Sequence, residues 1–258
     1  MIKIFALRPE LSTPRKSLNS PLGRTLAQQQ QPGLLPNAFR EQEGRLRERD
    51  YTLGISLCGK GSLWQDACIL LDGMAKSKVS PTVFSYSAAI SACEKGDQWQ
   101  WALTFLYEGM PEAKVSPNVF SYNAAVSACE KGGQWQHALA LFEDMPQKRI
   151  NPDVISYNAA ISACEKGGQG QEALALFRAM PLARISPTVI SYNAAISACE
   201  KGGQGQQALA LFVSMPRAQI NPDVISYNAV ISACEKGGNG SRQWPCLTQW
   251  SGATLLQV

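Results

Sequence analysis

The sequence predicts an all-α fold built as a helical repeat array, and three observations lead to this class. Residues 154–188 recur at 189–223 with 28 of 35 positions identical. Each copy carries two apolar patterns with helical spacing, separated by glycines. Each copy also closes with a proline-containing link. Self-similarity at this period is typical of solenoids, in which each unit buries its apolar face against its neighbours.

The repeat divides most of the chain at regular intervals. We expect full repeats at 83–118, 119–153, 154–188 and 189–223. A degenerate repeat is expected at 48–82, and 224–258 holds a partial repeat followed by a divergent C-terminal tail. The 83–118 copy has one extra residue near Leu106 to Gly109, which predicts a local bulge and not a break in the pattern.

One unit, counted from its first valine as position 1, shows the expected order of elements. In the 154–188 copy a first helix ends at Gly167 and Gly168, because glycine adopts the left-handed C-cap conformation at little cost. A second amphipathic stripe then follows, formed by Ala173, Leu176, Phe177 and Met180. Pro181 is expected to close this second helix, since proline fits badly inside a helix.

The first helix has two faces of different character. At roughly 100° of rotation per residue, positions 4, 8 and 11 fall within about 60° of one another. In the 154–188 copy these positions are Tyr157, Ile161 and Cys164, and we expect this face to pack between helices.

The opposite face carries positions 2, 5, 9 and 13 and repeats as a polar ribbon. In one unit it holds Ile155, Asn158, Ser162 and Lys166. Asparagine offers a donor and an acceptor to a base edge, and a spaced row of ammonium groups suits a phosphate backbone. The residues expected to contact phosphates are Lys95, Lys131, Lys166, Lys201 and Lys236. The alternative is that each lysine only favours the dipole at its helix C-terminus.

With these motifs, the unit resembles the pentatricopeptide repeat over residues 48 to about 238. Valine, Tyr-Asn, Lys-Gly, Ala-x-x-x-Phe and a terminal proline recur together at fixed spacing. The resemblance implies a right-handed α-solenoid, an α-α superhelix of helix-turn-helix repeats. It also implies binding of single-stranded RNA at one base per repeat, in organellar RNA processing, stability or translation.

The resemblance further assigns roles to side chains within each unit. Positions 5 and 35 are expected to contact a base edge, and an apolar residue at position 2 to pack against base faces. The expected base-reading residues are Ser87, Asn118, Asn123, Asp153, Asn158, Thr188, Asn193, Asp223 and Asn228. The expected base-packing residues are Phe84, Phe120, Ile155, Ile190 and Ile225. Packing between helices is the alternative for the phenylalanines at position 2.

The pairs at positions 5 and 35 predict a pyrimidine-leaning RNA by the family's usual code. Asparagine with aspartate prefers uridine, serine with asparagine prefers adenine, and asparagine with threonine leans to pyrimidine. The first unit is uninformative, because it pairs Thr52 with Thr82 and has Arg49 at position 2. With the N-terminal repeat toward the RNA 5′ end, the expected target is any base, A, U, pyrimidine, U and another pyrimidine.

Composition narrows the function classes. The formal net charge is +4, but residues 1–47 hold eight Lys or Arg against three Glu, which leaves 16 basic against 17 acidic residues in the rest. We therefore expect modest, salt-sensitive RNA affinity from focused lysines. No apolar stretch approaches the length of a bilayer span, so no membrane association is expected. Neither a zinc-deaminase motif nor an acidic nuclease cluster is present, and we expect no enzymatic activity.

The cysteines follow the repeat and not a metal site. Six of the eight occupy position 11, and no CxxC pair exists. His137, the single histidine, has no matching ligand cluster, so neither a metal site nor a cofactor is expected. The thiols suggest a reducing compartment.

Residues 1–47 are basic and contain serine and threonine, and they resemble a transit peptide followed by a glutamine- and proline-containing linker. This indicates a mitochondrial or chloroplast location. A disordered tail is the alternative, which leaves a cytoplasmic or nuclear location open.

Two questions stay open from the sequence. The 224–258 segment lacks the polar cap that solenoid ends need, so either its tail covers the last helix or the chain is a fragment of a longer protein. A protein-binding scaffold resembling tetratricopeptide repeats is the rival function, although its period is 34 residues. The RNA role also leaves room for protein partners in RNA processing. Recent duplication would allow some units to bind nothing.

Overall fold

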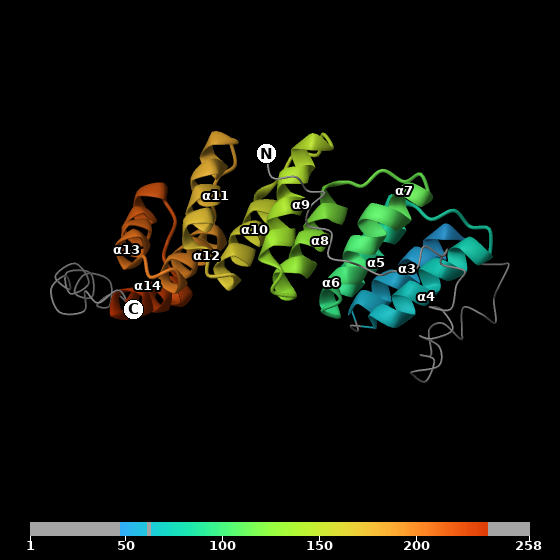
Figure 1. The fold of residues 1–258 in the computed structure, drawn as a ribbon, viewed down its shortest axis with the longest axis horizontal. Helices are drawn as coiled ribbons and strands as arrows, with labels where there is room; N and C mark the ends of the chain where they lie inside the picture. Colours follow the sequence, from blue (N-terminus) through green and yellow to red (C-terminus); the bar gives the residue numbers. More distant parts are fainter. Residues whose placement is uncertain (1–46, 61–62, 237–258) are drawn as a thin grey trace. The chain divides into compact units, whose positions relative to one another are not determined.

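The computed structural model describes residues 47–60 and 63–236, and every regular element in these ranges is helical (Figure 1). The all-α solenoid fold predicted from the repeat is confirmed. The transit-peptide-like segment and the divergent tail lie outside the described residues, apart from Arg47. None of the helices described has the length and apolar character needed to cross a bilayer.

Each repeat between 83 and 223 folds as a pair of helices joined by a tight turn, and the 48–82 repeat also contributes two helices. The first helices are α3 (Glu48–Lys60), α5 (Val83–Lys95), α8 (Val119–Lys131), α10 (Val154–Lys166), α12 (Val189–Lys201) and α14 (Val224–Lys236). The second helices are α4 (Trp64–Lys76), the run α6 (Trp99–Thr104), η2 (Phe105–Gly109) and α7 (Met110–Glu112), α9 (Trp135–Gln147), α11 (Gly170–Leu182), and α13 (Gly205–Ser214) with η3 (Pro216–Ala218).

The helices form two compact units, one ending at Pro152 and the other beginning at Asp153. In the first unit, α5 packs against α3 on one side and α8 on the other, so the first helices form a continuous layer. In the second unit, α12 packs in the same way between α10 and α14. In the second unit, α11 lies against its own first helix α10 and the next one, α12, and α13 lies likewise against α12 and α14 (Figure 1).

The predicted packing face of the first helix is buried, which confirms the rotation argument. In α12, Tyr192, Ile196 and Cys199 are all buried. Small side chains at positions 3, 7 and 10 are buried beside them, and in α12 these are Ser191, Ala195 and Ala198. Small residues permit close approach of neighbouring first helices, which leaves the bulky tyrosine to pack toward the second helices. Tyr192 contacts Phe177 of the preceding repeat edge-on, with ring centroids 4.7 Å apart.

Both helices of a repeat end in a left-handed residue that reverses the chain. At the end of α10 this residue is Gly168, with φ +68°, and the amide of Gln169 donates to the Cys164 carbonyl at 2.8 Å. At the end of α11 it is Arg184, with φ +60°, and the amide of Ile185 donates to the Met180 carbonyl at 2.9 Å. Both bonds are the six-to-one contact of a Schellman motif.

This geometry corrects the expectation that Pro181 closes the second helix. Pro181 lies inside α11, which continues to Leu182. Proline has no N–H to donate to the carbonyl four residues earlier, so Pro181 removes one backbone hydrogen bond near the end of the helix. The other bonds of the last turn can still form. The left-handed residue at position 31 ends the helix instead, and it is not glycine in any of the five copies, which are Lys78, Lys114, Arg149, Arg184 and Gln219.

The extra residue of the 83–118 repeat is absorbed by a π-helical turn. Its second helix is α-helical to Thr104, π-helical from Phe105 to Gly109, and α-helical again to Glu112. A π-turn holds one residue more than an α-helical turn, so the insertion widens one turn and leaves both ends in register. The predicted bulge therefore has a defined form, and α8 still packs on α5 as α5 packs on α3.

Candidate nucleic-acid interface

Apolar side chains at position 2 project from the start of the first helices into solvent. Phe84, Phe120, Ile155, Ile190 and Ile225 have exposed fractions from 57% to 67%. Such exposure excludes the alternative that the phenylalanines serve as interhelical core. A repeated exposed apolar residue carries a solvation cost that packing does not explain, and it is the kind of surface that contacts a ligand.

The residues at positions 5 and 35 meet at a buried serine of the following repeat. In the second unit, Ser226 Oγ donates to Asn193 Oδ1 at 2.6 Å, and Asn193 Nδ2 donates to Asp223 Oδ1 at 3.0 Å. One repeat earlier, Ser191 Oγ donates to Asn158 Oδ1 at 2.6 Å. The structure therefore brings Asn193 together with Asp223 at a bonding distance, while Asn158 is linked to Thr188 through Ser191.

The 48–82 and 83–118 repeats have the same arrangement, with a hydroxyl at position 5 in place of the amide. Ser87 Oγ lies 2.9 Å from Ser121 Oγ, and Thr52 Oγ1 lies 3.1 Å from Ser85 Oγ. Ser121 in turn donates its hydroxyl to Asn118 Oδ1 at 3.0 Å, so the pair at positions 5 and 35 of this repeat is again joined by the serine.

Position 35 has a structural role that the sequence reading missed: it is the N-cap of the next first helix. Asp153 Oδ1 accepts from the backbone N–H groups of Ile155 and Ser156 at 3.0 and 2.9 Å. In return, the side chain of the serine at position 3, here Ser156, accepts a hydrogen bond from the backbone N–H of the cap residue Asp153. Together these bonds form a capping box. The recurring Thr, Asn or Asp three residues before a serine is a sequence signal that could have revealed this cap.

The capping hydrogen bonds also stabilise the ionised form of the Asp223 carboxyl group. The pKa of its carboxyl lies below the ordinary value, chiefly because the backbone N–H of Ser226 donates to it, and also because Asn193 does. Asp223 is therefore an ionised acceptor at neutral pH. Asn228 is exposed, and Asn123 is buried.

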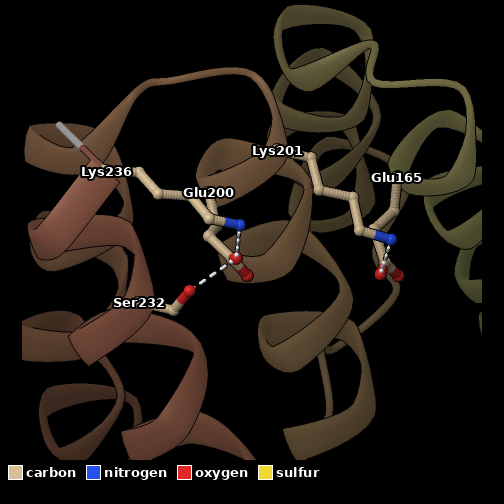
Figure 2. A network of polar contacts seen from close by, with 5 residues as sticks. All are labelled: Glu165, Glu200, Lys201, Ser232 and Lys236. Atoms are coloured by element: carbon tan, nitrogen blue, oxygen red, sulfur yellow. Dashed lines mark hydrogen bonds and ion pairs between the residues drawn. The ribbon is translucent and has the colours of Figure 1, made fainter.

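Lysines at position 13 of three repeats form ion pairs with the preceding repeat, a role that was not predicted from the sequence. Lys201 Nζ lies 2.9 Å from Glu165 Oε1, Lys236 Nζ lies 2.7 Å from Glu200 Oε1, and Lys131 Nζ lies 3.0 Å from Glu94 Oε1. Figure 2 shows how Lys201 and Lys236 each reach back to the glutamate at position 12 of the preceding repeat.

Glu200 has an additional partner. Ser232 Oγ donates to the same carboxylate oxygen at 2.7 Å (Figure 2). Burial alone would raise the pKa of Glu200, but the bonds from Lys236 and Ser232 outweigh it and lower the pKa below its usual range. Lys95 is placed differently, because position 12 of the preceding repeat is Gly59, which offers no carboxylate.

The position 11 cysteines form no metal site among the described residues, and no cluster of metal-ligating side chains occurs there. Burial raises the pKa of Cys129 to about 12, as it does for Cys164 with a smaller contribution from Glu172. The ring of His137 packs against that of Trp99 in a tilted arrangement, with the ring centroids 5.2 Å apart, and burial lowers the pKa of His137. These groups belong to the packing between helices.

Solved structures of pentatricopeptide repeat proteins have a similar fold. The crystal structure of the pentatricopeptide repeat protein PPR10 from maize is 26% identical, with a TM-score of 0.62 over 84% of this chain and 31% of that one. PPR10 in complex with an 18-nt psaJ RNA element is 22% identical, with a TM-score of 0.68 over 92% of this chain and 34% of that one. This chain thus spans about a third of PPR10.

A third structure is similar over nearly its whole length. The PPR domain of Arabidopsis thaliana protein-only RNase P 1, solved in complex with tRNA, is 14% identical with a TM-score of 0.60. The match covers 78% of this chain and 99% of that one. No curated protein sequence matches the chain significantly.

The sequence itself carries the family's pattern in three overlapping segments. The PPR repeat family model matches residues 117–166, 152–201 and 187–236. Each matched segment begins two residues before a first helix and ends at the last residue of the next one. With these matched repeats and the paired-helix architecture, the chain belongs to the pentatricopeptide repeat family.

Proposed function

We propose that this protein binds single-stranded RNA and reads one base per repeat through positions 2, 5 and 35. The observation that carries the proposal is the recurrence, in each full repeat, of an exposed apolar residue beside a polar pair. In the 189–223 repeat these residues are Ile190, Asn193 and Asp223. A flat apolar contact together with directional polar groups suits a nucleobase, which has an apolar face and a polar edge.

The pairs at positions 5 and 35 give the proposed order of bases. Ser87 with Asn118 selects A, Asn123 with Asp153 selects U, Asn158 with Thr188 selects a pyrimidine, and Asn193 with Asp223 selects U. Asn228, on the last described helix, adds a further pyrimidine. The proposed core target is A, U, pyrimidine, U and pyrimidine, 5′ to 3′.

Affinity is expected to be modest. Stacking in single-strand binders contributes about 1 to 3 kcal/mol per base, and few repeats are present. The lysines at position 13 share their charge with glutamates, so a phosphate must compete for each paired ammonium. This competition favours specific contact with bases over indiscriminate attraction to any polyanion.

The proposed biological role is passive occupancy of an RNA site, without catalysis by this protein. We propose that the protein protects or exposes an RNA site in organellar RNA processing, stability or translation, with other factors supplying catalysis. A reporter fused behind residues 1–47 tests the organellar location. Import into mitochondria or chloroplasts supports it, and a reporter that stays in the cytosol removes it.

The binding test is a titration of the full chain into fluorescently labelled RNA containing AUCUU, with a permuted RNA of equal composition as control. Fluorescence anisotropy is followed at low and moderate salt. We expect preference for AUCUU, weakened by Asn193→Ala and unchanged by Gln171→Ala, an exposed residue of the second helix. Equal binding to both RNAs contradicts base reading, and no binding by the folded protein contradicts RNA binding itself.

A further inference from the structure

The side-chain amide of Asn193 is held at both of its ends. Its oxygen accepts from Ser226 Oγ at 2.6 Å, and its nitrogen donates to the two oxygens of Asp223 at 3.0 and 3.2 Å. Rotating the amide by 180° would turn its oxygen toward the carboxylate, where two acceptors would face each other. The identity of the partners therefore fixes the orientation of this amide.

Ser226 is suited to hold the amide oxygen because its hydroxyl already accepts one hydrogen bond from the backbone and has one proton to donate. Its Oγ accepts the backbone N–H of Asp223 at 3.1 Å. Its single hydroxyl proton has two candidate acceptors, Asn193 Oδ1 at 2.6 Å and Asp223 Oδ1 at 3.0 Å, and the shorter contact identifies the amide. Ser226 is buried, so water does not compete for this bond.

We propose that the serine at position 3 is a positioning residue that fixes which edge of the preceding repeat's position 5 amide faces an RNA base. The inference rests on the proposed function and adds residues that touch no base in it. For Asn193 the positioning serine is Ser226, and for Asn158 it is Ser191.

The fixed orientation determines what a base can pair with. Asn193 directs one Nδ2 hydrogen to Asp223, and its other hydrogen remains as a donor for a base carbonyl oxygen. The ionised Asp223 lies alongside as an acceptor. Uracil offers a carbonyl oxygen next to an N–H group and matches this pair, whereas cytosine presents an unprotonated ring nitrogen to the carboxylate.

The 154–188 repeat provides an internal contrast. Ser191 holds Asn158 Oδ1 at 2.6 Å, but position 35 is Thr188, a hydroxyl that can both donate and accept. No carboxylate opposes rotation of the Asn158 amide. The serine alone therefore sets its orientation, and this repeat should distinguish uracil from cytosine less sharply than the 189–223 repeat does.

The orientation can be tested without RNA. In full-length protein labelled with ¹⁵N-asparagine, the two Asn193 side-chain N–H resonances should be well separated and slow to exchange with solvent. Ser226→Ala should shift them toward the values of exposed asparagine, and Ser226→Thr should restore them. Ser191→Ala gives the same test at Asn158 if Ser226→Ala does not fold. Unchanged resonances in a folded alanine variant overturn the proposal.

The consequence for base reading is tested with RNAs containing AUCUU or AUCCU, which differ only opposite the 189–223 repeat. In Ser226→Ala, the preference for uridine should fall about three- to tenfold, as expected for loss of one hydrogen bond, and Ser226→Thr should recover it. Ser121→Ala removes the equivalent capping serine of an earlier repeat, which contacts the Ser87 hydroxyl and the Asn118 amide but not Asn193, and should leave this preference at the 189–223 repeat unchanged.

The outcomes separate the two proposals. Equal weakening of both RNAs by Ser226→Ala means a purely structural serine and overturns the positioning role. If the folded wild-type protein binds neither RNA, the proposed function fails and base positioning fails with it. The asparagine resonances then still decide whether the serine holds the amide.

Discussion

Lys201 Nζ lies 2.9 Å from Glu165 Oε1, so the ammonium of one repeat neutralises a carboxylate of the repeat before it. The two side chains are not equally exposed: the lysine exposes 43% of its surface and the glutamate 20%. The same inequality holds for Lys236 with Glu200 and Lys131 with Glu94. Each lysine thus keeps solvent contact on the side away from its glutamate, where a second anion can approach.

Removing the glutamates should therefore release the lysines for phosphate. We expect Glu165→Gln with Glu200→Gln to raise RNA affinity and steepen its dependence on salt, because each freed lysine displaces a counterion from the RNA. The free energy of unfolding should fall by no more than about 1 kcal/mol per pair, as is usual for exposed ion pairs. Anisotropy titrations at several salt concentrations measure the effect.

The charge-matched control is Glu143→Gln with Glu172→Gln, two exposed carboxylates on the second helices α9 and α11. It changes the net charge per site equally and should alter RNA affinity less. If the double variant at Glu165 and Glu200 binds RNA no better than this control, the lysines at position 13 do not contact phosphates.

Position 2 should contribute to binding and not to folding. Ile190 is 63% exposed, so Ile190→Ser should leave the thermal midpoint nearly unchanged while weakening RNA binding about fivefold or more, by loss of contact with a base face. Leu182→Ser is the matched control, since Leu182 is 86% exposed on the second helix. Equal RNA affinities of the two variants would argue against base packing by Ile190.

The cysteines at position 11 should resist alkylation in the folded protein. Burial raises the pKa of Cys164 from the ordinary 9.0 to about 12 and that of Cys199 to about 11, so the reactive thiolate is scarce at pH 8. Peptide mass spectrometry after iodoacetamide treatment should find both unlabelled until denaturant is added. Rapid labelling in the native state would contradict the burial of these thiols.

The same shifts predict a dependence of stability on pH. Because the folded pKa is raised, the folded state holds these protons more tightly than the unfolded state does. The resulting stabilisation is complete below about pH 9 and is lost as the pH rises toward 11 to 12. Urea unfolding at pH 8 and pH 10.5 should show a lower free energy of unfolding at the higher pH.

Replacing the left-handed residues at position 31 by glycine should stabilise the fold. Arg184 has φ +60°, a conformation that is costly for a residue with a side chain, so Arg184→Gly should stabilise the fold by about 0.5 to 1 kcal/mol. Gln219→Gly, at φ +60° without a charge, should give a similar gain. Gly168→Ala, at φ +68°, should destabilise by a comparable amount. Urea denaturation measures all three, and a loss of stability in Arg184→Gly would refute the strain.

The helical faces were predictable because they depend on rotation alone. A fixed angle per residue places Tyr192, Ile196 and Cys199 together, and burial of a repeated apolar face follows from the repeat. Exposure of Ile190 could be expected from its place on the opposite face. The extra residue of the 83–118 repeat could be recognised from the sequence. Its accommodation in a π-helical turn could not, since several local geometries accommodate one additional residue.

The polar network was not predictable because it joins different repeats. Ser226 and Asn193 are 33 residues apart, and their bond forms only when the next helix is packed in place. Lys201 and Glu165 are likewise 36 residues apart, so helical spacing within one unit cannot show their contact. Proline was over-weighted as a stop signal, since the conformation of Arg184 ends the helix.

The π-turn at Phe105–Gly109 shows that an inserted residue has different consequences in the second helix and in the first helix of a repeat. An added codon in the second helix lengthens the gene without moving any side chain of the first-helix layer out of step, because α5 and α8 remain stacked as neighbours. A codon added within a first helix would instead displace position 2 from position 5 and scramble one letter of the proposed readout. The second helices can therefore vary in length while the first helices keep positions 2 and 5 in the spacing that the proposed base reading requires.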